Sequence, residues 1–124
     1  MKVIIGDDFA LKLVNFPNTD KQKIRLFILH LEKHGFDGLT GRNKSSDNVP
    51  FNDPNWSDKV AYAQKYQLWH YHIGIPNYTM TNNGEQISEY IIHYIKESDK
   101  IILISMSYHP PFELPDESIL SYQD

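Results

Sequence analysis

The stretch LWHYHIGIP at residues 68–76 decides the fold, because large apolar side chains alternate along it with histidines, as in a β-strand. His70 and His72 are two residues apart, so on a strand both project from the same face of the sheet. Two apolar runs follow at residues 90–95 and 101–109, and the second ends in His109. We expect the three segments to form an antiparallel sheet that carries the paired histidines on one side.

The turn between the last two strands sets which side chains share a face. If residues 98–99 form a two-residue loop, Ile95 lies opposite Ile102. That register places His93 and His109 on opposite faces of the hairpin. A slip by one residue would exchange the faces, because side chains alternate along a strand with a period of two.

The N-terminal half predicts helices that cover the sheet. A short strand is expected at residues 2–5, and apolar residues spaced by three and four predict a helix over residues 20–34 that ends at Gly35. Residues 36–58 form a long polar connection, with a helical turn expected near residues 56–63. We therefore predict one α+β domain over residues 1–124, with helices packed on a curved antiparallel β-sheet.

The composition limits the functions that the chain can have. It has 12 Lys and Arg against 16 Asp and Glu, a formal net charge of -4, and strongly basic domains are the usual electrostatic mark of nucleic-acid binding. Any surface that contacts RNA must therefore be small and local. The chain contains no cysteine, and no apolar run approaches the about 20 residues that span a bilayer. We expect a cytoplasmic protein that does not contact a membrane.

The histidines are the strongest candidates for chemistry. His70 and His72 could act as general acid and base, could bind a metal together with His93 or His109, or could be ordinary half-exposed strand residues. His109 ends a strand just before two prolines, which is a rigid place from which to present a catalytic group. Arg42 lies in a polar, glycine-containing loop from which it could reach a phosphate.

The order of these elements resembles the small microbial toxins of the RelE/ParE superfamily. The resemblance covers roughly residues 20–114: a helix, a loop, and then three antiparallel strands that end in the hairpin at residues 90–108. The loop at residues 41–43, the strand containing His70 and His72, and the approach to the hairpin are most similar to the YafO branch of mRNA interferases.

The resemblance implies a ribosome-dependent endoribonuclease that cleaves mRNA in the ribosomal A site, with the ribose 2′-hydroxyl as the nucleophile. It also implies a cognate antitoxin, with no metal and no cofactor. The residues that match the family's catalytic positions are His70, His72 and His109. Those that match its RNA-binding positions are Arg42, Tyr90 and Tyr108.

The acidic charge distinguishes this chain from typical members, which are basic and carry an arginine where Tyr90 begins the hairpin. An alternative from a different class is a non-enzymatic immunity or antitoxin-like protein that binds a basic partner toxin, since opposite potentials steer association. A zinc site held by the histidines is a third hypothesis.

Overall fold

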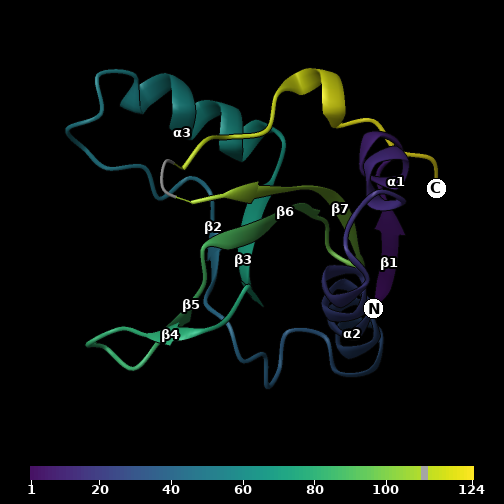
Figure 1. Ribbon diagram of the computed structural model, residues 1–124. Coiled ribbons are helices and arrows are strands. Elements are labelled where there is room, and N and C mark those ends of the chain that lie inside the picture. Colours follow the sequence, from purple (N-terminus) through teal and green to yellow (C-terminus); the bar gives the residue numbers. More distant parts are fainter. Residues whose placement is uncertain (110–111) are drawn as a thin grey trace.

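The computed structural model describes residues 1–109 and 112–124 of the chain. Its elements, in chain order, are β1 (Lys2–Ile5), α1 (Asp7–Leu13), α2 (Asn18–His34), β2 (Asn43–Ser45), α3 (Trp56–Lys65), β3 (Leu68–Ile75), β4 (Thr79–Met80), β5 (Gln86–Ile87), β6 (Tyr90–Lys96), β7 (Lys100–Tyr108) and the 3-10 turn η1 (Glu117–Ile119) (Figure 1).

Five strands form the main sheet in the order β1-β7-β6-β3-β2, and β4 pairs with β5 in a separate hairpin. The predicted α+β class is confirmed. The sheet is mixed rather than wholly antiparallel, because β1 lies parallel to β7 while the other neighbours are antiparallel. A parallel pair needs a long crossover connection, and here almost the whole chain lies between the two strands.

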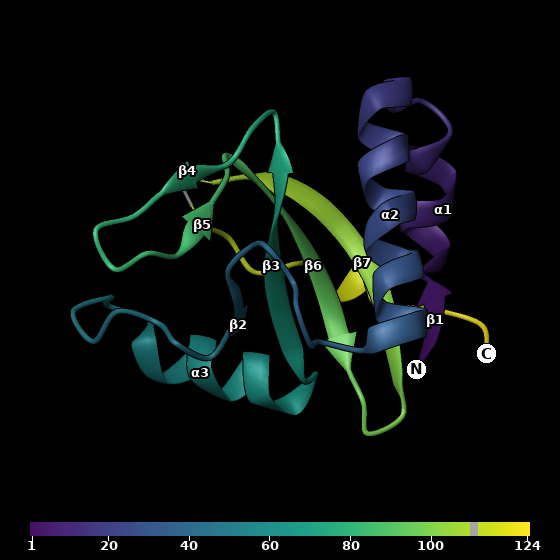
Figure 2. The same cartoon turned by 90° about the horizontal axis from the view of Figure 1, so that it is seen from below.

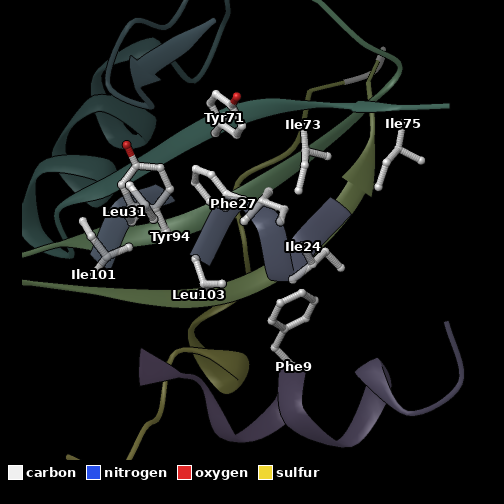
Figure 3. Close-up of a cluster of buried hydrophobic side chains, with 11 residues drawn as sticks. Phe9, Ile24, Phe27, Leu31, Tyr71, Ile73, Ile75, Tyr94, Ile101 and Leu103 are labelled. Atoms are coloured by element: carbon white, nitrogen blue, oxygen red, sulfur yellow. The ribbon is translucent and has the colours of Figure 1, made fainter. Parts of the chain in front are cut away.

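The two faces of the sheet are covered by different parts of the chain. Helices α1 and α2 lie side by side on one face, and α3 and the C-terminal tail cover the other (Figures 1 and 2). On the first face, Phe9 of α1 and the α2 stripe of Ile24, Phe27 and Leu31 point into the strands (Figure 3). The Phe27 ring stacks on Tyr71 with their centroids 4.4 Å apart. The apolar residues whose spacing predicts helix α2 are therefore the ones that α2 buries against the sheet.

The hairpin register is predicted correctly only at its closed end. Ile95 lies opposite Ile102, but an irregularity between His93 and Tyr94 shifts the register, so that His93 lies opposite Ser105 instead of Ile104. A bulge of this kind adds one residue to one strand and reverses the facing of all that follows. His109 therefore lies on the same side of the sheet as His93, which corrects the sequence-based expectation.

The long connection contains more structure than its composition indicates. Residues 43–45 form edge strand β2, which pairs antiparallel with β3, and the expected helical turn becomes the full helix α3. The β4–β5 hairpin projects from the edge of the molecule beside β2 (Figure 1). No helix among the described residues combines the length and the apolar character needed to cross a membrane.

Candidate functional site

Four histidines share one face of the sheet, which we call the histidine face. His70 and His72 come from β3, His93 from β6, and His109 follows β7. The ring centroids of His70 and His72 are 6.2 Å apart, and those of His72 and His109 are 5.9 Å apart. His70 is the cross-strand partner of His93. The three histidines predicted to be catalytic thus lie in one cluster, together with a fourth.

Phe112, in the tail that crosses this face, covers half of the cluster. Its ring centroid lies 4.7 Å from that of His70 and 5.7 Å from those of His93 and His109. Burial, with neighbouring imidazoles adding to it, lowers the pKa of His70 to about 3 and that of His93 to about 4. Both rings are therefore neutral at physiological pH.

The two covered rings are held by hydroxyl groups. His70 Nδ1 shares a hydrogen bond of 3.0 Å with Ser46 Oγ, and His93 Nε2 shares one of 2.8 Å with Ser107 Oγ. Ser46 and His93 are almost fully buried, at 2% and 1% exposure. His70 and His93 therefore contribute packing and hydrogen bonds to the fold.

The other half borders a cleft of about 460 Å³. One wall comes from the sheet and the other from the chain on either side of the β4–β5 hairpin. The lining residues are Arg42, His72, Pro76, Asn77, Thr79, Ile87, Ser88, Glu89 and His109. The cleft therefore brings together two of the three predicted catalytic histidines and the predicted phosphate-binding arginine, while His70 does not line it.

His72 is oriented by the backbone of Ser88. Its Nδ1 lies 2.9 Å from the Ser88 carbonyl oxygen and 3.0 Å from the Ser88 nitrogen, so this ring nitrogen is used within the protein in either neutral tautomer. Ser88 is itself fixed, because its hydroxyl accepts from the Gly74 N–H and donates to the Tyr90 carbonyl. His72 Nε2 is the nitrogen that remains for chemistry.

Arg42 is placed beside His72 by a close approach of two backbones. A Cβ on Gly41 would lie 1.8 Å from the His72 carbonyl oxygen, so only glycine fits there. The next residue is then fixed on both sides: the Arg42 N–H donates to the Gln86 carbonyl at 2.8 Å, and the Arg42 carbonyl accepts from the His72 N–H at 3.0 Å.

Two polar groups at this cleft form no hydrogen bond with any described residue. Arg42 Nε lies 3.4 Å from Glu85 Oε2 as an ion pair, yet it is buried and forms no hydrogen bond among the described residues. His109 Nδ1 is buried and unpartnered in the same sense. Buried polar groups are normally satisfied, so a buried guanidinium N–H and a buried imidazole nitrogen that both lack a hydrogen bond favour an anionic ligand in the cleft.

The pKa values of both cleft histidines are lowered in the free protein. Burial lowers the pKa of His72, although the contact with the Ser88 carbonyl opposes the shift, and the nearby His109 and Arg42 add to it. Burial and then the Arg42 charge lower the pKa of His109. A bound anion would offset the arginine and let one imidazole hold a proton.

Tyr90 and Tyr108 lie apart from this cleft. They pair across β6 and β7 with their ring centroids 5.4 Å apart, on the face that α1 and α2 cover. Tyr90 packs against the core there and Tyr108 is 50% exposed. Their RNA-binding role stays a prediction, and the structure does not bring them to the histidines.

Sequence reasoning missed Ser88 and Glu85, which act on His72 and Arg42 through contacts distant in the chain. No local pattern marks either residue. Within residues 1–109 and 112–124, no three His, Asp or Glu side chains gather in a way that could hold a metal ion.

Comparison of this chain with protein-family models, with curated proteins and with solved structures found no match. Its function therefore has to be argued from the cleft itself.

Proposed function

We propose that this protein is a ribosome-dependent mRNA endoribonuclease, the toxin of a toxin–antitoxin pair, which cleaves through attack of a ribose 2′-hydroxyl on the adjacent phosphate. The observation that carries the proposal is that His72 and His109, with ring centroids 5.9 Å apart, share one cleft with Arg42. Two imidazoles and a guanidinium are the groups this reaction needs: a base, an acid and a cation.

The reaction transfers a phosphoryl group within the RNA. One imidazole takes the proton of the 2′-hydroxyl as the 2′-oxygen bonds to phosphorus. The bond from phosphorus to the 5′-oxygen breaks, and the second ring, as an imidazolium, protonates that oxygen. The products are a 2′,3′-cyclic phosphate and a 5′-hydroxyl. Arg42 stabilises the charge that develops on the phosphorane oxygens.

The environments of the two rings favour different roles. The Ser88 carbonyl accepts from Nδ1–H of a protonated His72 and so opposes the lowering of its pKa. Among the described residues His109 Nδ1 has no such acceptor, and burial and the Arg42 charge lower the pKa of the ring. We assign His72 as the general acid and His109 as the general base. His70, beneath Phe112, supports the cleft without touching substrate.

The net negative charge of the chain is compatible with an mRNA substrate that the ribosome brings to the enzyme. A net charge of -4 gives little general attraction to RNA, because non-specific binding depends on phosphate neutralisation. The ribosome would present the message in place of such attraction. The enzyme would then act in the cytoplasm and would be restrained by a cognate antitoxin.

The test is induced expression followed by mapping of mRNA ends. We expect arrested growth and cuts in translated messages that leave 5′-hydroxyl and 2′,3′-cyclic phosphate ends. His109→Ala should abolish cleavage with the fold intact by circular dichroism, whereas His34→Ala, at an exposed site on α2, should cleave like wild type. Intact messages with wild type, or full cleavage by His109→Ala, would overturn the proposal.

The net charge also favours the second candidate, an acidic immunity or antitoxin-like protein that covers a basic partner. In that case wild-type expression leaves growth unaffected, and a pull-down returns a basic nuclease whose activity the protein inhibits. His109→Ala would then have no specific effect on that inhibition.

A further inference from the structure

Edge strand β2 presents alternate side chains to the two faces of the sheet. Asn43 points to the face under α2, where its Oδ1 accepts a hydrogen bond from the core residue Tyr94. Ser46 points to the histidine face, where its Oγ bonds His70 Nδ1. Because side chains alternate along a strand, Arg42 and Lys44 share the histidine face with Ser46.

Lys44 extends the positive charge of Arg42 along that edge. It is the cross-strand partner of His70, is partly exposed, and forms no ion pair among the described residues. Two residues along a strand advance by about 6.6 Å. This spacing is suited to successive phosphates of an extended single strand of nucleic acid. Proteins that bind single strands place positively charged side chains along the backbone.

β2 lies at the end of the main sheet, and beyond Arg42, whose N–H donates to the Gln86 carbonyl, its outer edge pairs with no other strand among the described residues. β2 is the last strand in the order, with β3 as its only partner in the main sheet. Edges of this kind are open to further chains. Among the described residues, Glu85 is the one carboxylate that forms an ion pair with either cation, and it pairs with Arg42.

We propose that Arg42 and Lys44 form a two-phosphate track, in which Arg42 holds the scissile phosphate and Lys44 holds the one next to it along the edge of β2. This inference rests on the proposed function and specifies its substrate as single-stranded RNA that is contacted through at least two consecutive phosphates. A ligand with one phosphate uses Arg42 alone.

The experiment compares two ligands that cannot be cleaved, a 2′-O-methyl dinucleotide with one phosphate and a 2′-O-methyl trinucleotide with two, titrated at low salt and followed by NMR. Lys44→Gln should weaken trinucleotide binding severalfold and leave dinucleotide binding unchanged. With a longer 2′-O-methyl oligonucleotide, the same variant should reduce the salt slope of log K by about 0.7. Arg42→Gln should weaken both short ligands.

Lys33→Gln is the matched control, because it makes the same charge change at an exposed site on α2. It should bind both ligands like wild type. The inference is overturned if Lys44→Gln affects the two ligands equally, if it affects neither, or if wild type binds neither. Lys44-dependent binding without mRNA cleavage would remove the proposed function and keep the track. Cleavage of mRNA together with ligand binding that does not depend on Lys44 would keep the proposed function and remove the track.

Discussion

The two halves of the histidine face contain the same residue type in very different surroundings. His70 and His93 lie beneath Phe112 and bond to buried or partly buried hydroxyls. His72 and His109 border a cleft that also contains Arg42. The difference shows that spacing along a strand places imidazoles on one face but does not decide which of them border the cleft, because that depends on how the tail and the β4–β5 hairpin pack around each ring.

The covered half has the larger consequence for stability. A neutral, buried imidazole resists protonation in the folded protein, but the same ring in the unfolded chain takes a proton near pH 6.5. Burial also lowers the pKa values of His72 and His109, so the cleft half contributes to the pH dependence with the same sign. Changes in pH, in Phe112, in the hydroxyl partners and in Glu85 should affect the two halves differently.

Acidification should have the largest effect. The pKa values of His70 and His93 are about 3 and about 4 in the folded state, below the value of 6.5 for the unfolded chain. The unfolded state therefore binds more protons between these limits, and the free energy of unfolding is highest above pH 6.5 and falls as pH drops toward 4. Each pKa unit is worth about 1.4 kcal/mol, so the loss should reach several kcal/mol. Urea unfolding at pH 7, 5.5 and 4.5 measures it.

The paired variant His70→Gln/His93→Gln is the control for that prediction. It should reduce the dependence between pH 6.5 and 5.5, a range in which carboxylates with ordinary pKa values near 4 stay mostly ionised, and the lowered pKa values of His72 and His109 leave the remaining slope. A wild-type stability that does not change over this range would contradict the assignment of two neutral, covered histidines.

Removing the cover should make the two halves alike. Phe112→Ala takes away the ring that contacts His70, His93 and His109, so water reaches His70 and its pKa should rise from about 3 toward 6.5. The lost packing should cost about 2 kcal/mol, less than for a fully buried Phe. NMR titration of the His70 ring protons reports the pKa, and Phe51→Ala, at an 83% exposed site, is the matched control. An unchanged His70 titration would show that the strand alone buries this ring.

The sequence predicts the strands and the helix that form the histidine face and its surroundings. It does not predict the difference between the two halves of that face. Strands β3, β6 and β7 and helix α2 follow from apolar periodicity, which reports one buried side of each. The β6–β7 bulge depends on the packing of whole strands and leaves no local signal, so the prediction that His109 and His93 lie on opposite faces was wrong.

The candidate site shows the same limit. His72, His109 and Arg42 are recognisable as chemically capable residues from the sequence. Strand β2 has no apolar alternation, because its three residues are Asn43, Lys44 and Ser45, and only pairing with β3 makes it a strand. His70, which does not line the cleft, packs against Phe112, which is 42 residues further along the chain. Contacts of that range are fixed by the fold as a whole.

Loss of a hydroxyl in the covered half should have a moderate effect on stability and little on cleavage. Ser107→Ala removes the hydrogen-bond partner of His93 Nε2. The other ring nitrogen of His93, Nδ1, already has no partner among the described residues. An unsatisfied buried group costs about 1–3 kcal/mol, and partial exposure of Ser107 places the expected cost near the lower limit. Urea unfolding measures the loss, and the mRNA end-mapping assay should give wild-type cleavage. A strong loss of cleavage with normal stability would place His93 in the chemistry.

The smallest effect is expected from the carboxylate beside the cleft. Glu85 Oε2 lies 3.4 Å from Arg42 Nε, and about a third of each side chain is exposed, so the pair contributes at most about 1 kcal/mol. Glu85→Gln removes a charge that competes with phosphate for the guanidinium. Binding of the 2′-O-methyl dinucleotide should tighten by up to about fivefold, since about 1.4 kcal/mol corresponds to tenfold. Glu32→Gln, at an exposed site on α2, makes the same charge change away from the cleft and should leave the affinity unchanged. If Glu85→Gln weakens binding instead, the carboxylate orients Arg42 toward the ligand and does not compete with it.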